Sequence, residues 1–511
     1  MHAFRRAFLF VIISLRRMIK FILLSEVSHF MENSAFAKQN AMDNEKSQIN
    51  TNPNSFMETE KIGTLMRRFA LPCIISLLVG ALYNIVDQIF IANADYLGSF
   101  GNAANTVVYP FTVIALAIAS MIGDGCCAFV SLSLGANNPE NARRSIGNSV
   151  ALTCAVGLII TAVYLIFAEP MLIAFGANVN AETFAMSKEY FFWITLGVPF
   201  YMFGQAMSSI IRSDGSPGYA MAVLLSGAIC NIILDPIFIF GFHMGMTGAA
   251  VATVLGQILS AILSFIYLFK MKAVKLKKKA FKPAAKILSK VISLGIPSFL
   301  AQISIVLSIA AVLNVCQIYG AKDPIFGQAQ YAQIPTAVIG IVMKFFQIVI
   351  SVAIGLSAGC IPIVGYNIGA CRNDRAKELL KKLLLCEAII GLIAMIIFES
   401  LPLPLINLFG AKNESIHYTN FAVRCIRLFL CTIVVSCINK GTFIYLQAMG
   451  KPLASTLLSL LREVVFGVGL VLLLPIWFKL DGLLYFMALS DILTFIATIF
   501  VLIFTFKRLN K

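Results

Sequence analysis

The chain has 511 residues, of which 59% are apolar and only 13% are charged, with a mean hydropathy of +0.88. This composition excludes a set of soluble domains and indicates a membrane protein. The net charge of +16 does not indicate a nucleic-acid partner, because the basic residues are concentrated in alternate connections between apolar runs.

Residues 1–30 are basic and apolar, but three basic residues between 16 and 20 interrupt the run before it can span a membrane. No small-residue cleavage site of a signal peptide follows. We therefore expect either an interfacial helix or translation that starts at Met31. Residues 31–60 are polar and rich in Asn, without an apolar period, which predicts disorder.

Apolar runs near the roughly 20 residues that a helix needs to cross a bilayer then follow one another. The predicted spans are 64–92, 104–132, 146–168, 188–210, 219–240, 247–269, 287–318, 327–357, 379–401, 418–440, 453–477 and 483–506. The fold class is therefore an all-α membrane protein of about 12 transmembrane helices.

The two halves of the chain resemble each other. LGANNPENAR (134–143) aligns with IGACRNDRAK (368–377), and FGANVN (175–180) aligns with FGAKNE (409–414), both at an offset of 234 residues. Because six spans is an even number, both halves enter the membrane from the same side, and their pseudosymmetry axis should run along the membrane normal. Parallel repeats of this kind enclose a central cavity between two lobes that can rock, as in transporters.

The predicted organisation is an N-terminal tail, an N-lobe, a basic linker, a C-lobe and a short tail, at 1–60, 61–270, 271–286, 287–506 and 507–511 respectively. Of 40 Lys and Arg, 26 lie in the two terminal tails and in every second connection between these spans, whereas 3 lie in the other connections. By the positive-inside rule, both termini and the linker should be cytoplasmic in a multi-pass protein of the cell membrane. The lysines of the linker are expected to contact anionic headgroups.

Enzyme signatures do not occur in this sequence. It has four histidines, no HExxH and no GxxxxGK[ST] phosphate loop, and its twelve cysteines show no metal or disulfide spacing. We therefore expect neither an enzyme nor a metal site nor a cofactor. Active transport would have to use an ion gradient.

Acids inside a span cost roughly 2.5–3.5 kcal/mol at the helix centre, so each is a functional candidate. Those that stand out are Asp87, Asp124 and Asp235. Asn231 lies one turn before Asp235 on the same helix face, and Pro236 cannot donate to the carbonyl of Ile232. A carboxylate, an amide and a free carbonyl suit a proton or a small cation. The alternative, an acid bonded to a neighbouring helix purely for packing, is strongest for Asp124, which lies between two glycines near a span end.

The motifs LYNIVDQIFIA around Asp87, NIILDPIFIFGF around Asp235 and TGAAVATVLG in span six resemble those of the multidrug and toxin extrusion (MATE) family, in its MepA-like and DinF-like branches. The resemblance covers about residues 60–506. It implies a MATE-like fold of two pseudosymmetric six-helix lobes and an antiporter that exports small organic, often cationic compounds. The implied coupling ion is a proton, with sodium possible.

The resemblance also implies roles for individual residues. The ion-coupling and substrate residues would be Asp87, Asn231, Asp235 and Thr253, and the helix bends would lie at Pro72 and Pro236. Sodium-using members carry acids in spans seven and ten. This chain instead has three amides in span seven and Lys440 at the end of span ten, so a C-lobe sodium site is not expected.

Further side chains are possible cavity lining, namely Tyr83, Asp124, Phe203, Lys344 and Phe346. Aromatic rings can stack on flat drugs, although such rings in spans usually contact lipid or neighbouring helices. The basic residues of the C-lobe either pair with acids and snorkel or face the cavity. If they face the cavity, the alternative function is a flippase for lipid-linked sugars. A third class of function is a non-transporting scaffold or a membrane enzyme. The expected partners are small drugs or toxins and the lipid bilayer, with the monomer as the functional unit.

Overall fold

A computed structural model describes residues 53–94, 97–175, 177, 181–328, 331, 334–407 and 415–509. The predictions of an interfacial helix or a start at Met31 concern residues that lie outside the described ones. The same holds for most of the repeat segments at 175–180 and 409–414, and for the last two residues.

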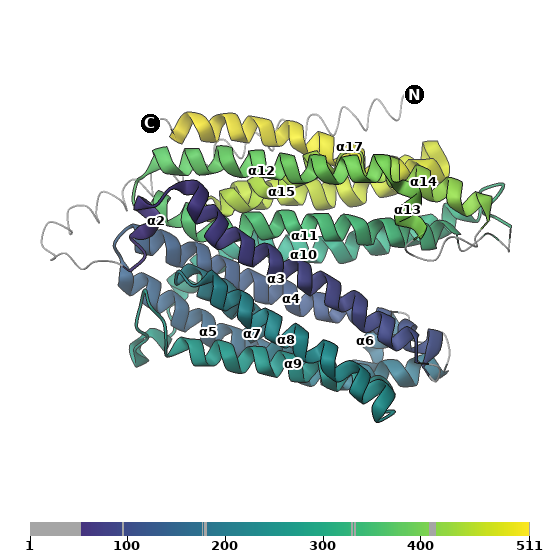
Figure 1. Ribbon diagram of the computed structural model, residues 1–511, viewed down its shortest axis with the longest axis horizontal. Coiled ribbons are helices and arrows are strands. Elements are labelled where there is room, and N and C mark those ends of the chain that lie inside the picture. The colour runs from purple at the N-terminus through teal and green to yellow at the C-terminus, as the bar shows by residue number, and fades with distance from the viewer. Residues whose placement is uncertain are drawn as a thin grey trace, which may run out of the picture.

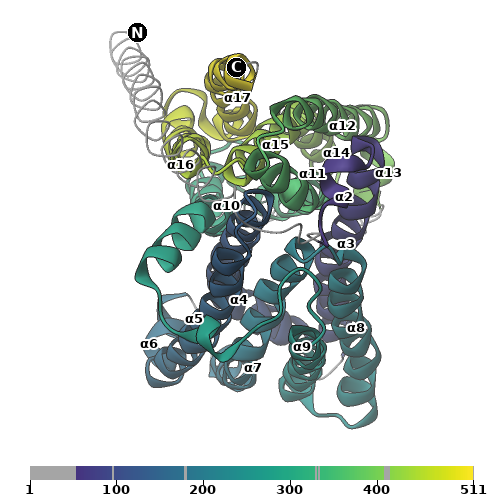
Figure 2. The ribbon, with the colours of Figure 1, turned by 90° about the vertical axis from the view of Figure 1, so that its left-hand side faces the viewer.

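The described helices form two groups that lie side by side (Figures 1 and 2). The first contains α2 (Phe56–Thr59), α3 (Ile62–Ala92), α4 (Gly98–Gly135), α5 (Pro139–Ile166), α6 (Ala168–Ala174), α7 (Ala181–Ser213), α8 (Pro217–Pro236), the π-helix η2 (Ile237–Gly241) and α9 (Gly245–Leu268). The second contains α10 (Ala285–Gly320), α11 (Ile334–Gly369), α12 (Asn373–Ser400), α13 (Pro402–Asn407), α14 (Ile416–Leu430), α15 (Ile433–Ala448), α16 (Pro452–Leu460), the π-helix η5 (Leu461–Val468) and α17 (Gly469–Leu509). These groups are the N-lobe and the C-lobe, and the 3-10 helix η3 (Lys278–Phe281) lies in the linker between them.

Eleven stretches of helix in the described part are long and apolar enough to cross a membrane. The last, Pro452–Lys507, has 56 residues, which at about 1.5 Å per residue is far too long for one crossing. It folds back at Lys479, where φ is 52° and ψ is −133°, and Ser490 then donates a hydrogen bond to the carbonyl of Arg462 at 3.1 Å. This hairpin supplies two crossings, which confirms the prediction of about twelve spans.

The repeat is visible in the turns as well as in the sequence. Asn137 and Cys371, 234 residues apart, have positive φ angles of 53° and 58°, and Gly215 and Gly450 have φ angles of 82° and 78°. Each pair follows the end of a long helix, where a left-handed residue ends the helix. The two lobes therefore share their turn geometry.

A seam of glycines brings α4 and α11 together across the two lobes. A Cβ at Gly135 would lie 2.0 Å from the carbonyl oxygen of Tyr366, and a Cβ at Gly369 would lie 2.2 Å from that of Leu132. At the offset of 234, Gly135 corresponds to Gly369 and Leu132 corresponds to Tyr366, so the two contacts are equivalent. The seam is therefore a pseudo-twofold contact, and it leaves no space for side chains.

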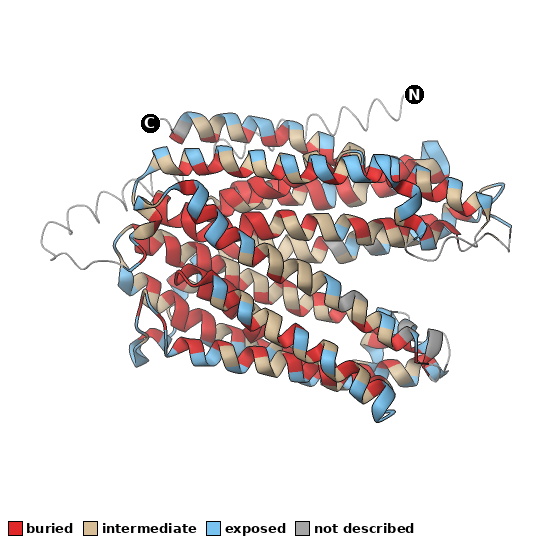
Figure 3. Ribbon diagram, viewed as in Figure 1, coloured by how far each residue is buried: buried red, intermediate tan, exposed pale blue. Residues whose placement is uncertain are grey.

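The same seam continues where each of these helices meets the first span of the opposite lobe. A Cβ at Gly295 on α10 would lie 1.9 Å from the carbonyl oxygen of Met121 on α4, and a Cβ at Gly359 on α11 would lie 2.6 Å from the Cα of Ala70 on α3. Figure 3 shows buried residues gathered where the two groups of helices meet near α2. The lobes thus meet by backbone contact at the end of the bundle that carries α2.

The expectation of disorder up to residue 60 is wrong for residues 53–60, which form a turn and α2. Asn54 donates to the carbonyl of Ser213 in the N-lobe at 3.1 Å, and Asn367 in the C-lobe donates to the carbonyl of Met57 at 3.1 Å. Met57 is only 1% exposed. This short segment is ordered because its apolar side chain and its polar backbone groups are used by both lobes.

The basic linker is also fixed to the N-lobe and is not a loose chain. Asn148 on α5 donates to the carbonyls of Ala280 and Lys282 at 2.9 and 3.1 Å and accepts from the backbone amide of Ala284 at 2.8 Å. One asparagine side chain thereby holds the C-terminal end of η3 and the residues that follow it. The backbone that carries the lysines around η3 therefore has a defined position on the N-lobe.

The seam makes a prediction about stability. Gly295→Ala places a methyl group against the backbone of Met121, and such overpacking costs about 1–3 kcal/mol, so we expect a lower thermal unfolding temperature in detergent. Gly340→Ala, also inside a helix, is the matched control, because nothing lies within 4 Å of its new Cβ. Equal unfolding temperatures for the two variants would contradict the close approach of α4 and α10.

Candidate functional site

The structure brings the two predicted acids of the N-lobe together. Asp87 on α3 and Asp235 on α8 are 6% and 0% exposed, and the two acids are close enough to interact electrostatically. Asp87 Oδ2 accepts from Asn105 Nδ2 at 3.3 Å, and Asp235 Oδ1 accepts from Asn231 Nδ2 at 3.1 Å. Each acid therefore has one oxygen bound to an amide.

The other oxygen of each acid has no donor among the side chains that the structure describes. Asp87 Oδ1 and Asp235 Oδ2 are buried without a partner, and two ionised carboxylates cannot satisfy each other because both only accept. A single proton shared between the two carboxyl groups gives one of them a donor and the other an acceptor. Two like charges in this position disfavour full ionisation of both carboxyl groups.

The remaining predicted residues join the same site. Asn231 Nδ2 also lies 3.2 Å from Thr253 Oγ1 on α9. Two glycines make this contact possible, because a Cβ at Gly256 would lie 2.5 Å from the carbonyl oxygen of Gly227. The close crossing of α8 and α9 therefore carries Asn231 and Thr253 to the carboxyl pair.

The two predicted helix bends differ. α3 runs from Ile62 to Ala92 without interruption through Pro72, whose carbonyl accepts from Ser76 Oγ at 2.8 Å. In contrast, α8 ends at Pro236 and continues as the π-helix η2. The backbone changes its hydrogen-bonding pattern directly after Asp235, as expected where proline removes a donor.

Sequence reasoning missed two residues of this site. Asn105 on α4 binds Asp87, and Tyr190 on α7 is buried close enough to interact electrostatically with both acids. The acids themselves were found because acids in spans are costly. A lone Asn or Tyr in a span carries no such signal, so only the packing of α4 and α7 against α3 identifies these two.

Asp124 belongs to a separate network between the lobes. Its Oδ1 accepts from Ser209 at 2.6 Å and from Arg212 at 3.3 Å, both on α7, and its Oδ2 accepts from Ser298 on α10 at 2.9 Å. Gln447 on α15 in turn donates to Ser298 at 3.0 Å. Asp124 therefore connects helices of the two lobes and has its own basic partner.

The other residues predicted to line a cavity are dispersed. Tyr83 is half-buried near the carboxyl pair, whereas Phe203, 9% exposed, packs in the apolar core around α7. Lys344 and Phe346 are half-buried on α11, with Phe346 against the C-lobe core. Their place in a transport cavity stays a prediction.

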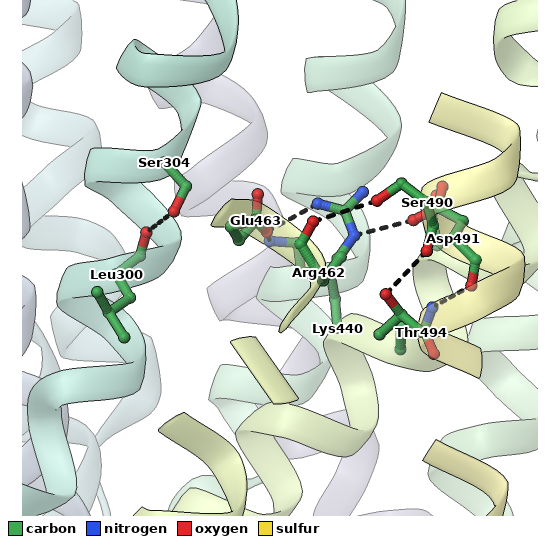
Figure 4. A network of polar contacts seen from close by, with 10 residues as sticks. Leu300, Ser304, Lys440, Arg462, Glu463, Ser490, Asp491 and Thr494 are labelled. Carbon is green, nitrogen blue, oxygen red and sulfur yellow. Dashed lines mark hydrogen bonds and ion pairs between the residues drawn. The ribbon is translucent and has the colours of Figure 1, made fainter. Parts of the chain in front are cut away.

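The C-lobe holds a buried charge network in place of a second open site (Figure 4). Arg462 on η5 donates through Nε to Asp491 on α17 at 2.9 Å and through Nη1 to Glu463 at 2.7 Å. Glu463 also binds Lys440 of α15, and Asp491 also accepts from Ser436. Two basic and two acidic side chains thus compensate one another, so that Arg462 follows the alternative of pairing with acids. The charge-compensated network below means these four charged residues.

Arg424 and Arg427 of span ten are exposed and are paired as well. Arg424 binds Asp481 at 3.0 Å, and Arg427 lies 3.6 Å from Glu399.

Among the described residues, no group of three or more His, Cys, Asp or Glu side chains is arranged to hold a metal ion.

A two-lobe bundle of twelve crossings with a buried carboxyl pair in one lobe defines a polytopic membrane protein of the transporter type. The family model MatE matches residues 72–237 and 327–473, which is more than half of the chain. The chain therefore belongs to the MatE family, and the resemblance to the MATE family is confirmed.

Several known proteins are similar over most of the chain. The multidrug export protein MepA of Staphylococcus aureus strain MSSA476 is 25% identical over 459 residues, which cover 89% of this chain and 96% of that protein. The MepA of Staphylococcus haemolyticus is 24% identical over the same length.

Solved structures share the fold. An outward-facing multidrug resistance MATE family transporter of the MOP superfamily has a TM-score of 0.80 at 21% identity, with 91% of this chain and 99% of that chain covered. A MOP superfamily transporter from Pyrococcus furiosus, described as having a binding pocket of reversed polarity, has a TM-score of 0.80 at 20% identity and the same coverage.

The charge-compensated network makes a prediction about stability. Glu463→Gln leaves Lys440 and Arg462 with one carboxylate between them, and breaking a buried pair costs about 3–5 kcal/mol. Asp481→Asn is the control, because its pair with Arg424 is exposed and worth about 0–1 kcal/mol. Thermal unfolding in detergent should therefore separate the two variants clearly. A Glu463 variant as stable as the Asp481 variant would contradict the buried network.

Proposed function

We propose that the protein is a secondary multidrug efflux transporter that exports small organic cations in exchange for protons. The observation that carries this proposal is the pair Asp87–Asp235, two buried carboxyl groups that lie together with no basic partner among the described residues. The similarity to multidrug export proteins supports the class of substrate.

In this mechanism the carboxyl pair holds either a proton or an organic cation. Burial favours the neutral form of a carboxyl group, so the pair takes up a proton readily when it faces the side of higher proton concentration. Protonation removes the negative charge that attracts a cation, and the substrate leaves. After the two lobes rock, the proton is released on the other side and the charge is available again.

One proton that moves down about 100 mV supplies roughly 2.3 kcal/mol, enough for a substantial gradient of a monovalent drug. Asn105, Asn231 and Thr253 do not titrate in this range, so we assign them to positioning the two carboxyl groups. We propose no enzymatic step.

Sodium is the alternative coupling ion, and a flippase is the alternative function. The oxygens of Asp87, Asp235, Asn231 and Thr253 are ligands that a sodium ion accepts, so this site itself supports both ions. The flippase needs anion-binding groups in the cavity, whereas Arg462 and Lys440 are bound to Glu463 and Asp491. We therefore favour export of organic cations.

We further propose a monomer in the cell membrane with both termini and the linker in the cytoplasm, from the distribution of Lys and Arg. On this orientation the seam and α2 lie at the cytoplasmic end. The described conformation is then closed toward the cytoplasm.

Asp235→Asn should abolish active export while membrane expression stays at the wild-type level, because an amide keeps the shape of the acid but cannot carry a proton. Drug resistance of cells that express the variant measures this. Asp374→Asn, an exposed acid of the C-lobe, is the control and should protect cells as the wild type does. Full resistance with Asp235→Asn would refute the assignment.

The coupling ion is tested in vesicles that contain the purified protein. At fixed membrane potential we expect a pH step to drive uptake of a fluorescent organic cation, and a sodium gradient at constant pH to drive none. The reason is that Asp87 and Asp235 have no basic partner among the described residues, whereas both acids of the charge-compensated network have one. Uptake driven by sodium alone would overturn the proton assignment.

A further inference from the structure

A third buried acid without a basic partner lies in the C-lobe. Glu387 on α12 is 0% exposed. Its Oε1 accepts from Ser357 Oγ on α11 at 2.5 Å, and its Oε2 is buried without a partner. The buried acids of the described spans thus fall into two sets. Glu463 and Asp491 form ion pairs. The acids without an ion pair are Asp87, Asp235 and Glu387.

The described neighbours of Glu387 include several apolar or weakly polar groups. Cys360 on α11 and Cys437 on α15 are close enough to interact electrostatically with it, as is its neighbour Cys386. Gly441 on α15 is also adjacent, since a Cβ there would lie 2.9 Å from Cγ of Glu387. On the side of α3, Cys73 faces Cys360.

The charged groups of the neighbouring helices are bound elsewhere. On α15, Lys440 binds Glu463, and on α17, Asp491 binds Arg462. On α14, Arg427 is close to Glu399, twelve residues further along α12. On α12 itself, Lys382 pairs with Glu378 at 2.6 Å. No ion pair in the described part of the chain involves Glu387.

The position is specific to the C-lobe. The offset of 234 maps Glu387 onto Thr153, whose hydroxyl donates to the carbonyl of Ser149 within its own helix at 2.8 Å. A small, locally satisfied hydroxyl therefore suffices for the packing of this helix in the N-lobe. Packing alone does not require an acid in the C-lobe.

We propose that Glu387 is a second proton-binding site of the transporter, which holds a proton in the described conformation and releases it to water in the opposite one. An ionised carboxylate with a single donor and no cation is costly in a dry interior, so the acid is neutral here. The step is a proton transfer alone: the O–H bond of the acid breaks, and water on the exposed side takes up the proton. This inference rests on the proposed proton antiport.

The first experiment uses the full-length protein in vesicles. Glu387→Gln mimics the protonated acid, so it should keep binding of a fluorescent organic cation and lose uptake driven by a pH step. Asp235→Asn should lose both, because it changes the cation site itself. Glu399→Gln, on the same helix but exposed, is the control and should keep both. Wild-type uptake with Glu387→Gln, while Asp235→Asn is inactive, would overturn the inference and leave the proposed antiport intact.

The second experiment reads the proton directly and does not depend on the coupling ion. Infrared spectra of the wild type near neutral pH should contain the carbonyl stretching band of a buried carboxylic acid that disappears in Glu387→Gln. If that variant fails to fold, Ser357→Ala should shift the same band, because it removes the hydroxyl bound to Oε1. Absence of such a band from the wild type refutes the proton at Glu387 even if sodium proves to drive transport. A lost band with unchanged pH-driven uptake also refutes the site.

Discussion

The constraint on which this structure depends is the cost of charge inside an apolar bundle. A buried acid there either has a basic partner or gives up its charge, and both solutions are present. Arg462 and Lys440 compensate Glu463 and Asp491, so these acids can stay ionised and hold spans ten, eleven and twelve together. Asp87 and Asp235 have only amides and each other, so a proton is the simplest way to satisfy them.

The cost of buried charge also explains why the two lobes, which share their turn geometry, differ in their interiors. In the N-lobe, Gly227 and Gly256 let α8 and α9 meet by backbone contact. Gly227 maps onto Arg462 at the offset of 235 that relates Gly215 to Gly450, and Gly256 maps onto Ser490 at the offset of 234. In the C-lobe, Ser490 donates a hydrogen bond to the carbonyl of Arg462, and the side chain of Arg462 forms the ion pair with Asp491. The N-lobe therefore places its helices close enough to present Asn231 and Thr253 to the acids, whereas the C-lobe uses its polar groups for cohesion.

Much of this architecture was predictable because membrane spans and repeats leave strong local signals. The spans follow from length and apolarity, the lobes from the repeat, and Asp235 with Asn231 from one helix turn. What the sequence did not reveal depends on packing between helices: Asn105 beside Asp87, the order of residues 53–60, and the pairing of Arg462 with Asp491. Glu387 also depends on packing, because only the neighbouring helices show that the lysines before it do not compensate it: Lys382 pairs with Glu378.

The position of the glycine seam bears on how the lobes separate in the proposed cycle. Gly135, Gly295 and Gly369 contribute no side chains, so the backbones of the two lobes touch directly there. Beside the seam, apolar side chains of both lobes share one core, which has to open when the lobes part. The cross-lobe hydrogen bonds that must break include those of Asp124 with Ser298, of Asn367 with Met57 and of Arg375 with the backbone of Glu60. Water replaces such bonds at little net cost once it enters. The seam is therefore compatible with rigid lobes that part at this end, and the carboxyl groups without basic partners then determine which ion accompanies that movement.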